Sequence, residues 1–295
     1  MSIENIPKRK NALSIVAGFK CPEGIVLCAD TQETTGVAKR SIPKLRFEPS
    51  GTPQIGEGLA VAFCGAGDNG AFIDRLVQNA WEDAQLGTNA KQVCEIIQNT
   101  IESTYKKYKE IYGAGCCPMV DLVYGVKMSN ECRLFSASGA VVNERESYDS
   151  FGAGQYMADF LKNRMYNRYL NLRQCAILAA YILFQAKEHV DGCGGESHIA
   201  ILRGNGPSGM ISQIKTNALT KLLGISDYHM STLLLDYADI ELPYRSLAEM
   251  NQTAIQIIES ARTSTVDELD QHEKHMAAIS GSGKTEVDFF GFPVG

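Results

Sequence analysis

The stretch SIVAGFKCPEGIVLCADTQETTG, residues 14–36, contains two short runs rich in β-branched and other apolar residues. The runs, Leu13–Phe19 and Gly24–Ala29, are separated by KCPE, which is typical of a turn. The pattern therefore predicts a β-hairpin. The second run, GIVLCA, is apolar at successive positions, so both of its faces should be covered by other layers of the fold.

On the C-terminal side of this hairpin, strands and helices alternate in groups up to about residue 205. Leu59–Phe63 reads as a buried strand that ends in the small-residue bend CGAGDNG. Apolar residues at helical spacing predict helices over Phe72–Ala84, Ala90–Tyr112, Gln155–Met165 and Leu172–Glu188. The remaining apolar runs predict strands at Met119–Val126, Cys132–Ala137, Val141–Tyr148 and His198–Leu202.

The order of these elements is strands, two helices, strands, two helices and a final strand. Each helix pair can cover the outer face of a sheet while two sheets pack on each other, which predicts an α+β fold, a four-layer αββα sandwich. Periodicity alone leaves a doubly wound α/β fold as an alternative. We expect an N-terminal arm over 1–12, the sandwich domain over 13–214 and a mostly helical extension over 215–295. Helices are expected there at Ala218–Leu235, Ser246–Arg262 and Val266–Ala278.

The composition of the chain disfavours some classes of binding protein and indicates in which cellular compartment it is expected. The chain has 28 Lys and Arg against 34 Asp and Glu, a net charge of −6, which disfavours general binding to nucleic acids or anionic membranes. No apolar run is long enough to cross a bilayer, and no signal peptide is recognisable at the start. The nine Cys are an odd number, without a CxxC pair, and several lie in apolar runs. Buried reduced thiols and a cytoplasmic location are therefore expected.

Four blocks of the sequence resemble proteasome β-type subunits and their bacterial relatives, the proteasome-like N-terminal-nucleophile hydrolases. The resemblance spans about Leu13 to Arg203 and does not include the C-terminal extension. The most specific block is the opening one, with its strand, turn and GIVLCAD. The four blocks are residues 14–36, LAVAFCGAGDNG at 59–70, SFGAG at 150–154 and AKEHVDGCGGESHIAIL at 186–202.

The resemblance implies a catalytic group made of a nucleophile, a lysine and an aspartate. In this family an N-terminal Thr, Ser or Cys attacks with its side chain, and its own α-amine is the general base. An ungapped match places the nucleophile at Ser14, the aspartate at Asp30 and the lysine at Lys44; a two-residue gap would instead place the lysine position at Arg46. The bend that stabilises the oxyanion or holds substrate matches Cys64 and Gly65.

Three further positions match residues that support the nucleophile in the family. They are Asp191, Cys193 and Ala153, and at the last two the family's hydroxyl groups are replaced. Family members that mature by self-cleavage have Gly before the nucleophile, whereas this chain has Leu13. Activity therefore requires cleavage of the bond before Ser14, which would free the α-amine.

Two functions follow from these matches. The first is a peptidase subunit that cleaves polypeptides inside an oligomeric ring, and the alternative is a non-catalytic structural subunit of a proteasome-like complex. A third reading is an enzyme of the same fold that acts on a small amide under a lid formed by the extension. Partners would be like or unlike proteasome-like subunits; no cofactor, metal, nucleic acid or membrane is expected. A candidate subunit contact is the stripe Val93, Ile97, Ile101 and Tyr105.

Overall fold

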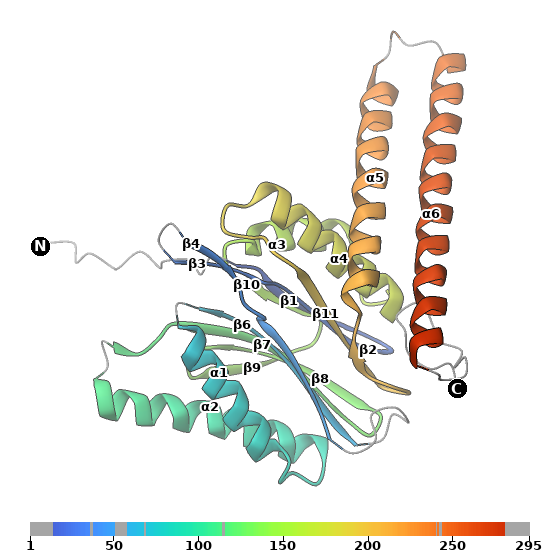
Figure 1. Ribbon diagram of the computed structural model, residues 1–295. Helices are drawn as coiled ribbons and strands as arrows, with labels where there is room; N and C mark the ends of the chain where they lie inside the picture. Colours follow the sequence, from blue (N-terminus) through green and yellow to red (C-terminus); the bar gives the residue numbers. More distant parts are fainter. Residues whose placement is uncertain are drawn as a thin grey trace, which may run out of the picture. The chain divides into compact units, whose positions relative to one another are not determined.

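The structure is a computed structural model that describes residues 14–35, 38–50, 58–67, 69–113, 116–239, 241 and 244–280. The predicted N-terminal arm over 1–12 lies outside these residues. The chain divides into two compact units, 1–210 and 211–295 (Figure 1). Within the described part of the chain, no helix is both long enough and apolar enough to span a membrane.

The first unit contains a five-stranded sheet built around the predicted hairpin. Its strand order is β10-β1-β2-β11-β12, and every neighbouring pair is antiparallel. The strand β2 is buried along its whole length, as its apolar sequence predicted. The strands are β1 (Val16–Cys21), β2 (Gly24–Asp30), β10 (Tyr148–Phe151), β11 (Ser197–Arg203) and β12 (Gly209–Met210).

A second five-stranded sheet has the order β5-β6-β7-β8-β9, again with antiparallel neighbours only. A separate hairpin of two strands, β3 (Gln32–Thr35) and β4 (Ala38–Ser41), follows β2. This topology contradicts the doubly wound alternative, which requires parallel strands. The strands of the second sheet are β5 (Leu45–Pro49), β6 (Leu59–Gly67), β7 (Val120–Met128), β8 (Glu131–Ser138) and β9 (Val141–Arg145).

Helices cover the outer faces of the two sheets (Figure 1). The helices α1 (Gly70–Ala84) and α2 (Ala90–Tyr112) share a hydrophobic core with β6, β7 and β8, whereas α3 (Gln155–Met165) and α4 (Leu172–His189) contact the first sheet. A second core combines side chains of both sheets. Asn side chains cap α1, α2 and α4 by accepting hydrogen bonds from backbone amides of the first turn.

Three local predictions need correction. The strand β6 continues through the expected bend to Gly67. The single strand expected over 141–148 is two strands, β9 and β10, because the chain crosses there from one sheet to the other. The stripe proposed as a subunit contact, Val93, Ile97, Ile101 and Tyr105, is buried in the core under α2 and is therefore unavailable to a neighbour.

The second unit is a hairpin of two long helices, α5 (Gln213–Ala238) and α6 (Tyr244–Ser280). The two predicted segments at 246–262 and 266–278 form one continuous helix, since the intervening Thr and Ser residues do not end a helix. Ser212 caps α5, and the buried Lys215 forms an ion pair with Glu273 at 2.7 Å.

Glycines allow the two sheets of the first unit to approach closely. An added Cβ at Gly125 of β7 would lie 2.6 Å from Leu202 and 3.1 Å from Leu27 in the opposite sheet. At Gly18 of β1, it would lie 2.6 Å from Val123. These distances are shorter than any normal carbon–carbon contact, so side chains at the two positions would force the sheets apart.

We therefore expect Gly125→Ala to lower the free energy of unfolding by about 1–3 kcal/mol, as overpacking of a core does. The matched control is Gly70→Ala at the start of α1, where an added Cβ would meet only Glu33, at 3.6 Å. The control should keep or raise stability, since Ala favours a helix over Gly. Urea unfolding of both variants measures the difference, and equal midpoints would contradict this account of sheet packing.

Candidate functional site

Asp30 lies at the end of β2 and is fully buried. Its Oδ1 accepts hydrogen bonds from the Ile15 amide at 3.1 Å and from Lys44 Nζ at 2.7 Å, and its Oδ2 accepts one from the Gly194 amide at 2.9 Å. One carboxylate thus connects three segments that are far apart in the sequence. Burial raises the pKa of Asp30, and Lys44 together with the two amides opposes that shift.

Lys44 lies immediately before β5, with only 11% of its side chain exposed. Besides the ion pair with Asp30, its Nζ donates a hydrogen bond to the backbone carbonyl of Gln32. Burial lowers the pKa of Lys44, and the neighbouring Asp30 raises it. The ion pair brings together the lysine and the aspartate that the family resemblance implied. The alternative lysine position, Arg46, instead pairs with Asp74 of α1.

Ser14 is 2% exposed and directly precedes the residue whose amide binds Asp30. Its carbonyl accepts a hydrogen bond from the Gly154 amide at 3.1 Å. Its Oγ is buried and has no hydrogen-bond partner within the described residues. Gly152, with φ of +97°, packs against Ser14, and an added Cβ there would lie 3.4 Å from that Oγ.

The three supporting positions differ in their surroundings. Cys193 is buried, and an added Cβ at Gly154 would lie 3.1 Å from its Sγ. Ala153 is half-buried in the turn before α3 and offers no polar side-chain atom. Asp191 is exposed, and among the described residues no hydrogen bond or ion pair joins it to Asp30 or Lys44. Of the three, the structure places Cys193 closest to the ion pair.

Cys64 and Gly65 lie within the regular strand β6 and not in a bend. The amide of Gly65 donates to the Lys44 carbonyl at 3.0 Å as part of the pairing with β5. It is therefore occupied and cannot stabilise an oxyanion without breaking that pairing. The sequence interpretation failed here because a small-residue run is compatible with either a bend or a tightly packed strand.

Sequence reasoning named Asp191 and Cys193 in the loop that precedes β11 but missed the contacts of residues 194–196 in the same loop. Backbone amides of residues 31 and 32 donate to the Gly194 carbonyl, and Thr31 Oγ1 accepts a hydrogen bond from the Glu196 amide at 2.8 Å. Gly195 has φ of +71°, a conformation that favours glycine. The glycine-rich string GCGG was the available sequence signal. Glycine is needed at 194 and 195 because a side chain at either position would clash with residue 31 or 32.

Lys187 of α4 is a second lysine near Asp30 that the sequence interpretation did not single out. Its Nζ donates to Ser197 Oγ at 3.2 Å, and Ser197 pairs directly with Asp30 across the β2–β11 ladder. Burial lowers the pKa of Lys187, and Asp30 gives the largest opposing effect. The buried site thus combines two cations with one carboxylate. In the described part of the chain, no group of three or more potential metal ligands is present.

The fold resembles solved structures of Anbu proteins. The Gly-1 mutant of Anbu from Hyphomicrobium sp. strain MC1 aligns with a TM-score of 0.58 and 16% identity over 78% of this chain and 99% of that chain. Anbu, described as an ancestral beta-subunit, from Yersinia bercovieri gives 0.58 and 15% over 78% and 98%. The helical assembly of the Anbu complex from Pseudomonas aeruginosa gives 0.59 and 12% over 78% and 97%. At these identities, the likeness concerns the fold alone.

Sequence comparisons identify the family. Among curated protein sequences, no relative matches the chain. The family model described as "Proteasome subunit" matches residues 10–202, which is more than half of the chain. The match includes the whole second sheet, the helices α1 to α4, and the first sheet except β12 and the last residue of β11. The match also includes Ser14, Asp30 and Lys44. The chain belongs to the proteasome subunit family.

Proposed function

We propose that this chain is a proteasome-like peptidase subunit that becomes active when cleavage before Ser14 frees the Ser14 α-amine. In this proposal the first unit is the αββα sandwich typical of N-terminal-nucleophile hydrolases, and the protein acts on polypeptides in the cytoplasm within an oligomer. The Anbu complex from Pseudomonas aeruginosa forms a helical assembly, which supports assembly here as well.

One observation carries the proposal. Ser14, whose buried hydroxyl has no hydrogen-bond partner within the described residues, directly precedes Ile15, and the Ile15 amide binds the carboxylate of the buried Asp30–Lys44 ion pair. An unpaired hydroxyl and a desolvated lysine both cost stability, and folding alone does not require them at the start of a strand. Such an arrangement is typical of a reaction centre that awaits a further group.

The chemistry follows from the groups at the site. A free Ser14 α-amine would titrate near pH 8, so a useful fraction would be neutral and able to accept the hydroxyl proton. Ser14 Oγ would then attack a peptide carbonyl, and the protonated α-amine would return its proton to the departing amine as the C–N bond breaks, which leaves an acyl ester on Ser14. The Lys44 ammonium favours negative charge that develops nearby, and Asp30 fixes the position of that ammonium. A water molecule, activated by the same amine, would hydrolyse the ester.

The backbone donor for the oxyanion is better assigned to Gly67 than to Gly65. Amides of alternate residues along a strand point to the same side, and the Gly65 amide points toward Lys44. The Gly67 amide therefore points to the side of β6 on which β5 lies. The strand β5 begins at Leu45, which pairs with Cys64, so β5 does not reach Gly67. We propose Cys64 and Gly65 as structural parts of the strand and Gly67 as the donor.

A non-catalytic assembly subunit is the second candidate function. Ala153 and Cys193 stand where the family has supporting hydroxyl groups, Leu13 stands where self-cleaving relatives have Gly, and Asp191 is exposed. These departures remove help from the nucleophile but leave Asp30 and Lys44 paired. The free N-terminus is the feature that separates the two functions.

We expect a chain prepared to begin at Ser14 to hydrolyse a fluorogenic peptide library, whereas the full-length chain does not. Only the shortened chain has an α-amine at the nucleophile. Ser14→Ala in the shortened chain should abolish hydrolysis. N-terminal sequencing of protein from the native host should begin at Ser14. An intact N-terminus there, together with an inactive shortened chain, would assign the assembly role instead.

In the shortened chain, Lys44→Ala should lower kcat/KM on the order of 10²-fold or more, comparable to the loss of one preorganised electrostatic contact. The control is Lys39→Ala, because Lys39 is an exposed lysine of β4. Thermal unfolding must accompany the rates, since removal of Lys44 leaves Asp30 buried without its cation. Equal rates for both variants would exclude Lys44 from the reaction.

Cys193 is the other nucleophilic side chain close to the ion pair, and burial raises the pKa of its thiol to about 12. The thiolate is the reactive form, so Cys193 should resist alkylation at pH 8. In the native protein, we expect iodoacetamide to modify Cys193 more than about 100-fold more slowly than the exposed Cys116. Peptide mass spectrometry measures both rates, and denaturation should remove the difference. Rapid native labelling of Cys193 would make it a competing nucleophile.

A further inference from the structure

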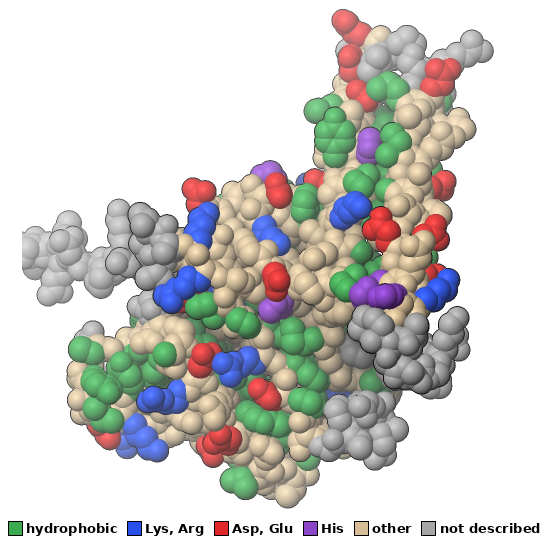
Figure 2. Space-filling model, in the orientation of Figure 1, with side chains coloured by type: hydrophobic (Ala, Val, Ile, Leu, Met, Phe, Trp, Pro, Cys, Tyr) green, Lys and Arg blue, Asp and Glu red, His purple; other side chains and the backbone are tan. Residues whose placement is uncertain are grey.

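The hairpin of α5 and α6 leaves many large apolar side chains exposed, and Figure 2 shows hydrophobic side chains gathered along α5. Two helices alone cannot cover all apolar faces of each other, so extended helical hairpins usually pack on a further element. The hairpin lies outside the residues matched by the proteasome family model. The exposed large apolar side chains among the described residues between 228 and 257 are Tyr228, Met230, Leu234, Leu235, Tyr237, Ile255 and Ile257.

Three of these side chains form an apolar ridge on α5, which we define as Met230, Leu234 and Tyr237. Their spacing of four and then three residues places them in one row along the helix. On the N-terminal side of Met230, the row ends one turn earlier at Asp227. On α6, Ile255 is a further exposed apolar side chain. The ridge is thus a short row of large knobs, each about half exposed or more.

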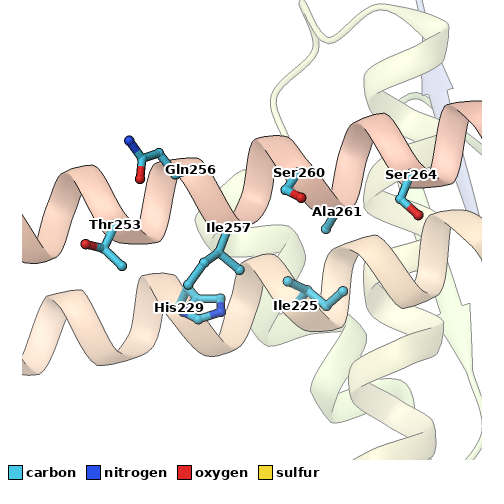
Figure 3. A pocket seen from close by; sticks show the side chains of 8 residues that line it. All are labelled: Ile225, His229, Thr253, Gln256, Ile257, Ser260, Ala261 and Ser264. Atoms are coloured by element: carbon cyan, nitrogen blue, oxygen red, sulfur yellow. The ribbon is translucent and has the colours of Figure 1, made fainter.

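A groove between α5 and α6 has a volume of about 560 Å³ (Figure 3). Ile225 and His229 of α5 and Ile257 of α6 point toward one another in it. Its lining contains no Lys, Arg, Asp or Glu, and most of the lining side chains from α6 are small. The eight lining residues are Ile225, His229, Thr253, Gln256, Ile257, Ser260, Ala261 and Ser264.

The ridge and the groove lie on opposite flanks of the hairpin. Leu233 is buried while residues 231, 232, 234 and 235 are exposed, so Leu233 serves as the reference direction on α5. At 100° per residue, His229 lies about 40° to one side of it, and Leu234 lies about 100° to the other. A hairpin therefore cannot insert its ridge into its own groove, but a second copy of the chain can do so.

We propose that the apolar ridge of one copy docks in the hairpin groove of a second copy. Large knobs meet a groove with a small-residue rim, and the four-three spacing of the ridge matches that of Thr253, Ile257 and Ser260 along the groove. Neither the ridge nor the groove lining contains Lys, Arg, Asp or Glu, whose burial without a partner would be costly. The pairing is head-to-tail, so each bound copy still offers a free ridge or a free groove.

The exposed area is sufficient for such a contact. A standard interface buries about 800 Å² per partner, of which about 60% is apolar, so roughly 500 Å² of apolar surface is needed. The ridge and Ile255 supply four exposed side chains at roughly 100 Å² each, which is most of that amount. This contact is independent of the catalytic proposal and of any association through the first unit.

The test uses the full chain with a photoreactive benzoylphenylalanine in place of Tyr237, mixed with ¹⁵N-labelled copies that lack the probe. Mass spectrometry should find cross-links from position 237 of unlabelled copies to residues 253–264 of labelled copies. Leu234→Glu in the probe-bearing copy should lower this yield more than about 30-fold, as the loss of a central interface residue does. The same substitution in the labelled copy should leave it unchanged, because that copy contributes only its groove.

Ser260→Trp supplies the reciprocal variant, since it fills the groove from an exposed position. It should abolish cross-linking when the labelled copy carries it and have no effect in the probe-bearing copy. The matched control is Leu86→Glu in the first unit, where Leu86 is 76% exposed against 68% for Leu234, and the yield should not change. Cross-links confined to one copy, or equal losses whichever copy carries Leu234→Glu, would overturn the proposal.

Discussion

The arrangement of the first unit depends on the hydrogen bonds and the ion pair that the Asp30 carboxylate forms. It is fully buried and is satisfied by Lys44, by the Ile15 amide and by the Gly194 amide. A buried charge is tolerated only when such partners are in place, so the strand start, the segment before β5 and the loop before β11 must all meet at β2. The same carboxylate thus joins the Lys44 ammonium to the amide of Ile15, the residue that directly follows Ser14.

The charged side chains of the candidate site are in place, whereas the proton acceptor that the proposed reaction needs has not yet been formed. Lys44 and Lys187 both lie near Asp30, whereas the hydroxyl of Ser14 has no partner within the described residues. The residue that would supply the base is Ser14 itself, through an amine that is still part of a peptide bond in the full-length chain. The proposed activity would therefore require one covalent change, cleavage before Ser14, and no rearrangement of the fold.

The two units of the chain are stabilised in different ways. In the first unit, glycines let two sheets interlock, and helices cover both outer faces, so its apolar stripes are internal. The second unit has only one seam between two helices, and much of its apolar surface is left exposed. The exposed apolar side chains of the hairpin are therefore the basis of the contact between copies that we propose.

The sequence by itself determined the buried hairpin of β1 and β2 and the bounds of α2 and α3, and the family resemblance pointed to Asp30 and Lys44, with Arg46 as the alternative to Lys44. Apolar periodicity reports how each local segment is buried, and an ion pair follows when two charges must be buried together. Only the tertiary structure decided that the amides of Gly194 and Ile15 donate hydrogen bonds to Asp30 and that the Gly65 amide donates to the Lys44 carbonyl. The burial of the apolar stripe of α2 in the core was likewise decided by the tertiary structure. Backbone amides are chemically alike along the chain, so their partners are fixed only when distant segments cross.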